Sequence, residues 1–163
     1  MALMENIPRR AALLLGGLVL GLLLFSAQPL RAESDGCALL KPADLTTLLG
    51  GTPIANPNAG GCIWTVSGST KKLVAINKYK ANGPAAEMAF AGARGNAGKG
   101  GDVVTDEAGL GDKVFSNLAS FGVALMVLKQ GRLLQLQYWT GAAGTAKDLD
   151  ALRPVAKKAI AAF

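Results

Sequence analysis

The sequence contains no histidine, and this absence limits the possible chemistry more than any other feature of the composition. Without histidine, neither a Ser-His-Asp triad nor a Cys-His pair can form, and the commonest metal-binding side chain is missing. General acid–base catalysis would have to use carboxylates, lysine or tyrosine. We therefore expect no catalytic residues, no metal site and no cofactor, and we favour a protein that is not an enzyme.

A strong charge of either sign is also missing. The chain has 17 lysine and arginine residues against 11 aspartate and glutamate residues, a net charge of +6. These charges are scattered, as is typical of a soluble surface, although a mild excess of this kind is also compatible with an anionic envelope surface. No basic run is interleaved with aromatic residues, so nucleic acid is not expected as a partner.

One long apolar run is present, and it lies near the N-terminus. Residues 11–25 are apolar without a break, follow the basic pair Arg9-Arg10, and precede a polar segment that ends at Ala32. Basic, apolar and small-residue regions in this order are typical of a secretory signal. The apolar run is 15 residues long. A membrane-spanning helix needs about 20.

This signal determines the expected domain organisation and compartment. We predict that residues 1–32 form a cleaved signal peptide and that residues 33–163 form a single domain, periplasmic or secreted. The alternative is an uncleaved segment that anchors the domain to the membrane. Contact with a membrane is expected only in that case.

Cysteine is scarce, with Cys37 and Cys62 as the only two. In an oxidising compartment an even pair indicates a disulfide, and no CxxC redox spacing or histidine supports a reactive thiol or a metal site. A bridge between them would close a loop of about 25 residues and stabilise the fold by roughly 3.5 kcal/mol in the chain-entropy model. We predict a structural disulfide between Cys37 and Cys62.

Apolar periodicity predicts three helices, over 42–49, 84–97 and 146–162. In the second helix, Met88 and Phe90 are expected to face a sheet. Pro154 is expected to kink or restart the last helix, because proline removes a backbone donor.

Strands are predicted wherever β-branched and aromatic residues cluster between turn signals. The segment 52–61 contains prolines and paired glycines and is expected to be a loop. The order of elements indicates an α+β domain, with an antiparallel sheet of about five to six strands covered on one face by helices and closed by one disulfide. The predicted strands cover 62–66, 71–80, 103–105, 114–117, 121–129 and 132–139.

The predicted strand over 132–139 carries the candidate ligand-binding residues. Polar and apolar side chains alternate along it, which indicates one buried and one wetter face. Gln135, Gln137 and Trp139 lie on the wetter face, and Trp139 is the large aromatic residue most expected to be exposed. We predict that these three residues form a binding face, with a core role for the aromatic ring as the alternative.

Residues 69–72 match S-x-x-K, the nucleophile motif of serine–lysine acylases. Those enzymes need the serine at the start of a helix, so that the lysine lies one turn away. Here a predicted strand follows the motif, and the other motifs of those enzymes are missing. A polar hairpin turn is the favoured interpretation.

A glycine-rich segment over 92–101 contains Arg94 and Lys99 and suggests a phosphate-binding loop. The spacing of a Walker A motif is absent, and the segment follows a predicted helix rather than a strand. We favour a mobile linker at this position.

Four acids lie close together further along the chain. Oxygen ligands of this kind suit calcium, but the alternation of an EF-hand loop is absent. A solvated turn is the favoured interpretation. The acids are Asp102, Asp106, Glu107 and Asp112.

Several short motifs are similar to those of a family of small exported bacterial proteins, the domain-of-unknown-function 3558 proteins and related lipoproteins. The resemblance spans most of 37–163 and implies a disulfide-closed α+β domain at the cell envelope. It implies no catalytic residues, because the family has no established activity. The chain lacks a lipobox before Cys37, so no lipid anchor is expected. The matching motifs are CALL at 37–40, PAD at 42–44, LLG at 48–50, CIW at 62–64, GLGDK at 109–113, the hairpin over 127–134 and the alanine-rich last helix.

These observations lead to three functional hypotheses. The first is a non-enzymatic envelope protein that binds another envelope protein, a cell-wall component or a small apolar ligand through its sheet face. The second is a secreted inhibitor of a hydrolase, suggested by the small, basic, disulfide-closed domain. The third is a small enzyme that uses lysine or carboxylates, which would need a pocket beside Lys71, Lys72 or the acids of 102–112.

Overall fold

The computed structural model describes residues 36–58, 60–78 and 83–163. The predicted signal peptide, residues 1–32, lies outside these described residues. No helix within the described ranges combines the length and the hydropathy that a membrane span requires.

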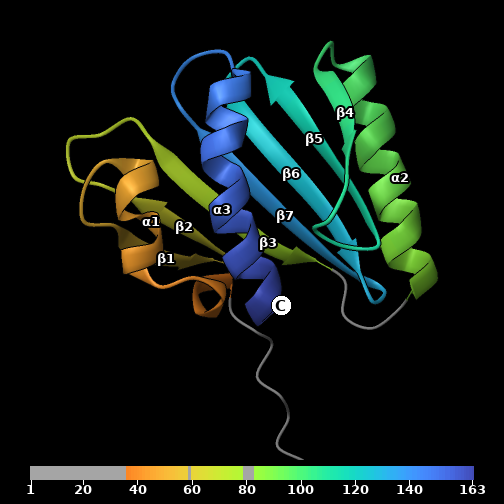
Figure 1. Cartoon of the computed structure of the whole chain (residues 1–163), viewed down its shortest axis with the longest axis horizontal. Helices are drawn as coiled ribbons and strands as arrows, with labels where there is room; N and C mark the ends of the chain where they lie inside the picture. Colours follow the sequence, from red (N-terminus) through yellow and green to blue (C-terminus); the bar gives the residue numbers. More distant parts are fainter. Residues whose placement is uncertain (1–35, 59, 79–82) are drawn as a thin grey trace, which may run out of the picture.

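A single antiparallel sheet of seven strands forms the centre of the domain (Figure 1). The spatial order is β1-β2-β3-β7-β6-β5-β4, so β7 pairs with both β3 and β6. The predicted α+β class is confirmed, but the predicted count of about five to six strands is too low. The strands are β1 Ile54–Asn58, β2 Gly61–Thr65, β3 Lys72–Lys78, β4 Val103–Glu107, β5 Lys113–Ala119, β6 Gly122–Lys129 and β7 Arg132–Trp139.

The additional strand is β1, which lies in the segment that the sequence predicts to be a loop. It forms a tight hairpin with β2, in which Asn58 faces Gly61 and Pro57 faces Cys62. Proline is tolerated because β1 is an edge strand of the sheet that the described residues form. Pairing with β2 therefore overrides the weak strand propensity of this segment.

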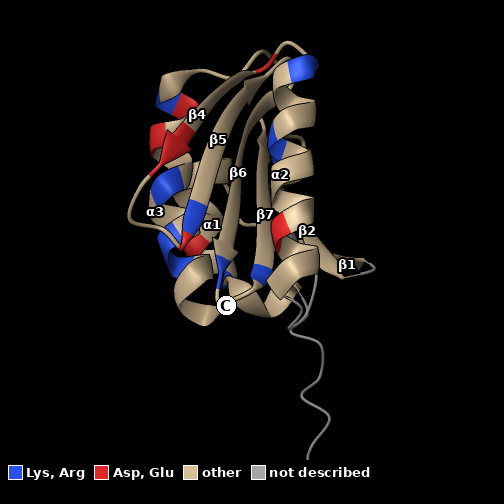
Figure 2. Ribbon diagram, turned by 90° about the vertical axis from the view of Figure 1, so that its right-hand side faces the viewer, with Lys and Arg blue, Asp and Glu red and all other residues tan. Residues whose placement is uncertain are grey.

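Helices cover both faces of the sheet, whereas the sequence predicts coverage of one face (Figure 2). The 3-10 helix η1 (Gly36–Leu39), α1 (Pro42–Leu49) and α3 (Ala146–Ala162) pack on the first face. The helix α2 (Gly83–Lys99) packs on the second face. The prediction is wrong because the alanine-rich α2 has a weak apolar stripe, which does not indicate the side of the sheet that it covers.

The larger core lies between the sheet and the helices α1 and α3. Alternate residues of the strands point into it, and the largest side chains there are fully buried, among them Trp64, Leu73, Leu125 and Leu136. Each side chain of this size contributes about 1.5–3 kcal/mol when it leaves water. This core holds α1 and α3 at fixed positions on the first face.

The helix α3 continues through Pro154, so the predicted restart is wrong, while a kink at this residue stays a prediction. Pro154 is exposed, while Leu152 and Val155 on either side of it are buried against the sheet. Tertiary packing therefore holds the helix together where a backbone hydrogen bond is missing. The predicted capping box is present, since the Thr145 side chain accepts a hydrogen bond from the backbone N–H of Asp148.

A smaller core lies beneath α2 on the second face. Ala86 and Phe90 pack against sheet residues, with the Phe90 and Phe115 ring centroids 5.2 Å apart. Met88, predicted to face the sheet, is 72% exposed, because it lies two positions from the buried stripe. The predicted mobile linker over 92–101 is also wrong, because α2 continues to Lys99.

The predicted disulfide between Cys37 and Cys62 is confirmed, with a Cα–Cα distance of 4.8 Å. It links η1 to β2 on the first face of the sheet. Disulfides persist in oxidising environments and are rare in the cytosol, so this bond indicates a compartment outside the cytoplasm.

Candidate functional site

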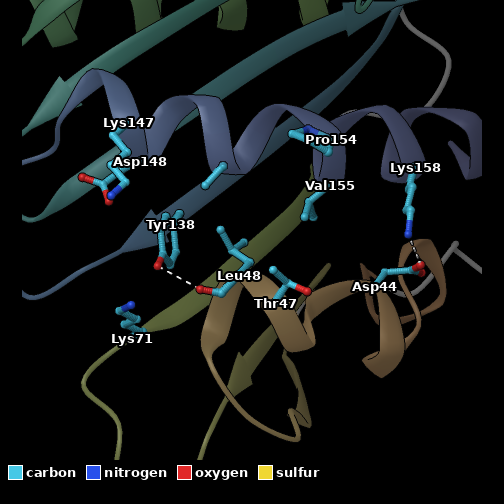
Figure 3. Close-up of a pocket in the computed structure, with 11 residues that line it drawn as sticks. Asp44, Thr47, Leu48, Lys71, Tyr138, Lys147, Asp148, Pro154, Val155 and Lys158 are labelled. Carbon is cyan, nitrogen blue, oxygen red and sulfur yellow. Dashed lines mark hydrogen bonds and ion pairs between the residues drawn. The ribbon is translucent and has the colours of Figure 1, made fainter.

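A cleft of about 530 Å³ opens between α1 and α3 on the first face (Figure 3). Ligand-binding clefts usually have volumes of about 300–1,000 Å³, so this one has the size to hold a small molecule. Its walls come from four parts of the chain: α1, the residue before β3, β7 and α3. The lining residues are Asp44, Thr47, Leu48, Lys71, Tyr138, Lys147, Asp148, Ala151, Pro154, Val155 and Lys158.

The floor of the cleft is formed by Tyr138, which points from β7 towards the end of α1. Its hydroxyl donates a hydrogen bond of 3.0 Å to the carbonyl oxygen of Leu48. Carbonyls in the last turn of a helix have no partner within the helix, so this bond satisfies one of them. Tyr138 is only 3% exposed, and its side chain therefore fixes α1 to the sheet beneath the cleft.

An ion pair closes one end of the cleft. Lys158 on α3 donates to Asp44 on α1, with 2.7 Å between Nζ and Oδ1, and the backbone N–H of Lys41 donates to the other carboxylate oxygen at 3.0 Å. The bond from Lys158, followed by that from Lys41, lowers the pKa of Asp44 below its ordinary value. Asp44 therefore stays ionised and paired at neutral pH.

Two lysines lie near Tyr138, towards the opposite end of the cleft from this ion pair (Figure 3). Neither the Lys71 nor the Lys147 ammonium forms an ion pair or a hydrogen bond with another residue in the part of the chain that the structure describes. The neighbouring Asp148 has other partners, because its carboxylate accepts from Thr145 at 3.0 Å and 2.6 Å. The lysine end therefore carries two ammonium groups, unpaired among the described residues, and the Asp148 carboxylate, a local charge of 2 − 1 = +1.

The wall between the two ends is largely apolar. Leu48 contributes from α1, and Pro154 and Val155 contribute from α3 (Figure 3). Ala151 of α3 also lines the cleft. The cleft is thus amphipathic along its length, with a net positive end, a middle that is apolar apart from Thr47, and a neutralised pair at the other end. An arrangement of this kind can hold a molecule by both charge and apolar contact.

The predicted binding face around Trp139 lies on the opposite side of the sheet from the cleft. The structure places Gln135, Gln137 and Trp139 together on the second face of β7, as their spacing predicts, and all three are half-buried. A binding role for them stays a prediction.

Trp139 already has contacts within the chain. The Phe121 ring centroid lies 4.4 Å from that of Trp139, and the Lys72 Nζ lies 4.1 Å from the indole centroid. The indole N–H donates to the Gln137 Oε1 at 3.5 Å. These contacts occupy part of the ring surface that a ligand would need for stacking.

The S-x-x-K motif at 69–72 is a hairpin turn between β2 and β3, as the sequence predicts. The Ser69 hydroxyl accepts a hydrogen bond of 3.1 Å from the backbone N–H of Lys71, a local turn interaction. The two lysines go to opposite faces of the sheet, Lys71 to the cleft and Lys72 to Trp139. The motif is not on a helix, so the serine–lysine chemistry has no support.

The four clustered acids have separate structural partners and line no part of the cleft. Among the described residues, no group of three or more histidine, cysteine, aspartate or glutamate side chains could hold a metal ion. Asp102 accepts from Asn117 at 2.6 Å, Asp106 from Arg94 at 2.9 Å, Glu107 from Arg153 at 2.8 Å and Asp112 from the backbone N–H of Gln130 at 2.6 Å.

Glu107 accepts more hydrogen bonds than the other three acids. Two nitrogens of Arg153 on α3 donate to its two oxygens at 2.8 Å and 3.2 Å, and the Ser116 hydroxyl donates at 2.8 Å. The bonds from Arg153 are the main reason that the pKa of Glu107 lies below its ordinary value. This pair joins α3 to the β4 edge of the sheet and is structural.

Comparisons with protein-family models, with curated proteins and with solved structures found no significant match to this chain. The function of this chain is therefore inferred from its own residues. The resemblance to exported envelope proteins of unknown function stays an expectation from the sequence.

Proposed function

We propose that this chain is a non-enzymatic binding protein of the bacterial envelope, periplasmic or secreted, that holds a small ligand in the cleft between α1 and α3. The observation that carries this proposal is the amphipathic lining of the cleft, with Lys71 and Lys147 at one end and apolar side chains behind them. The disulfide supports a location outside the cytoplasm.

The contacts of the polar groups favour binding over catalysis. The cleft lies beside Lys71, as the hypothesis of a lysine-based enzyme requires. Its two acids, however, are held by Lys158 and Thr145, and the Tyr138 proton is donated to a backbone carbonyl. The acid beside the lysines, Asp148, is thus occupied by the helix cap, which argues against a role for it in proton transfer.

The experiment that tests this proposal maps two simple probes, decan-1-ol and decanoate, onto the protein purified as the cell exports it. Addition of at least one probe is expected to shift the amide NMR signals of residues 44–48 and 147–158. Ala151→Trp places an indole in the cleft and should abolish these shifts. Ala151 is exposed, so the variant should fold.

The matched control is Ala161→Trp, since Ala161 is also an exposed alanine on α3 but does not line the cleft. This control variant should bind both probes as the wild type does. If neither probe shifts the signals of the cleft in the wild type, or if both tryptophan variants behave alike, the proposed function is wrong.

A further inference from the structure

We infer that the ligand of the α1–α3 cleft is an amphiphile with one anionic head group, a carboxylate or a phosphate, on an apolar chain. This inference rests on the proposed function, because it names the class of ligand for the same cleft. It deepens the proposal by assigning each part of the ligand to particular side chains.

The head group is assigned to the end of the cleft at Lys71 and Lys147. The cleft is lined by three lysines and two aspartates, so its net charge is 3 − 2 = +1. Lys158 is neutralised by Asp44, so the whole excess lies at the end near Tyr138, where two lysines and the Asp148 carboxylate give 2 − 1 = +1. Neither ammonium group there has a hydrogen-bond or ion-pair partner among the described residues. Two lysines placed around one site bind an anion as point charges.

The start of α3 adds to this attraction. The helix begins at Ala146, directly before Lys147, so the positive end of its dipole lies at the same end of the cleft. The Thr145 and Asp148 capping box satisfies backbone donors there but leaves the Lys147 ammonium free. The dipole and the two lysines therefore attract an anion, and the Asp148 carboxylate in the same helical turn offsets one of these positive charges.

The apolar chain is assigned to the wall formed by Leu48, Pro154 and Val155. An inorganic anion would leave this wall in contact with water, and a neutral hydrocarbon would leave the lysines without a counter-charge. A molecule with one anionic end satisfies both parts of the cleft. The methylene stems of the lysines extend the apolar surface towards the head group.

The far end of the cleft limits the ligand to a single charged end. Asp44 there is ionised and paired with Lys158. A second carboxylate on the ligand would lose its hydration beside a lysine that is already paired, a cost that no new ion pair offsets. The cleft should therefore bind a monocarboxylate more tightly than the dicarboxylate of the same length.

The test compares the dissociation constants of decanoate, decan-1-ol and decanedioate, each below its micelle concentration, by calorimetry at pH 7. We expect decanoate to bind the wild type about tenfold more tightly than the alcohol, since two partly solvated charge contacts amount to roughly one factor of ten. Decanedioate should bind more weakly than decanoate. The preference for decanoate over decan-1-ol should disappear in the double variant Lys71→Met/Lys147→Met.

The control variant is Lys157→Met, because Lys157 is an exposed lysine of α3 that does not line the cleft. It should keep the full preference for decanoate. If the double variant fails to fold, each single variant, Lys71→Met or Lys147→Met, should lose about threefold of the preference. If Lys157→Met loses as much of the preference for decanoate as the cleft variants do, the assignment of the head group to Lys71 and Lys147 is wrong.

The outcomes separate the inference from the proposed function. Equal affinities for decanoate and decan-1-ol in the wild type would overturn the anionic class while the cleft remains a binding site. Absence of binding by all three probes would overturn both. Vesicles of phosphatidylglycerol test whether the anionic head group belongs to a membrane lipid. Binding to these vesicles without binding to free decanoate would contradict a ligand seated in the cleft.

Discussion

The two faces of the sheet are covered differently. On the first face, η1, α1 and α3 pack over a core that receives side chains from β2, β3, β5, β6 and β7. On the second face, α2 packs over β4, β5, β6 and β7, and among the described residues no helix packs over β1 and β2 (Figures 1 and 2).

This difference indicates how a concave site can arise in so small a domain. Two helices lying side by side on the first face leave a cleft between them, with the sheet as its floor. Among the described residues the second face has a single helix, and the predicted site around Trp139 is part of a sheet surface. A small ligand loses more contact with water in a cleft than on a sheet surface, which favours the first face.

The largest expected effect compares neighbouring core residues on β6. Leu125 points to the first face and is 0% exposed, while Met126 points to the second face and is 7% exposed. We expect Leu125→Ala to lower the free energy of unfolding by about 4 kcal/mol and Met126→Ala by about 2.5 kcal/mol. Urea denaturation measures both, and an equal or larger loss for Met126→Ala would contradict the dominance of the first core.

Removal of the disulfide tests how much this bond stabilises the first face of the domain. The variant Cys37→Ala/Cys62→Ala should lose about 3.5 kcal/mol of unfolding free energy, because the unfolded chain regains the freedom of a loop of about 25 residues. Unfolding in urea, with and without a reducing agent, measures the loss. A wild type whose stability is unchanged by reduction would show that the bond contributes little.

The hydrogen bond beneath the cleft should have a smaller effect. Tyr138→Phe removes the donor to the Leu48 carbonyl and leaves that acceptor without its partner. We expect a loss of about 1.5 kcal/mol. Hydrogen exchange should become faster in α1 and stay unchanged in α2, since only α1 is held by this bond. Equal acceleration in both helices would indicate a general loss of stability instead.

The pair between Glu107 and Arg153 should make stability depend on pH. Because the folded pKa of Glu107 is lowered, its contribution is fully present above the unfolded value of 4.5 and is lost as the pH falls through the folded value. Arg153 is 36% exposed, so screening limits the contribution to about 1 kcal/mol at pH 7. Glu107→Gln should therefore be less stable at pH 7 and less sensitive to acid below pH 4.5.

The control for this prediction is Asp106→Asn, the adjacent acid, whose ion pair with Arg94 lies in solvent. Its unfolding free energy at pH 7 should not change measurably. If Asp106→Asn alters acid stability as strongly as Glu107→Gln does, the partly buried pair contributes no more than the exposed pair, and the prediction for Glu107 is wrong.

The smallest expected effect concerns the second face. Trp139→Ala should change the dissociation constant of decanoate by less than about twofold, because the site in the cleft shares no contact with the indole. A larger loss of affinity, measured by the same calorimetry, would show that the two faces are coupled or that the ligand binds on the sheet surface.

Much of the fold could be predicted from local patterns. The strand over 132–139 and the helix over 146–162 agree with the structure at both ends, because alternation is clear in the first and a capping box marks the second. β1 could not be predicted, since pairing with β2 rather than its own residues makes it a strand. The side of the sheet that α2 covers is likewise a tertiary property.

The site was harder to predict than the fold. The sequence drew attention to Lys71 through a motif that proved to be a turn, and it gave no signal for Lys147 or Tyr138 as cleft residues. The cleft joins α1 and α3, which lie at opposite ends of the described chain, so no local spacing could reveal it. The capping box at Thr145 and Asp148 predicts where α3 begins, but it does not predict which helix lies beside α3.

The most direct test of the central claim is the position of decanoate on the protein, measured by intermolecular nuclear Overhauser effects to methyl groups on the two faces. Leu48 and Val155 report on the cleft, and Val74 on the second face of the sheet. The account predicts effects between the methylene chain and Leu48 and Val155, with none to Val74. Effects to Val74 alone would place the ligand on the sheet face and contradict the account.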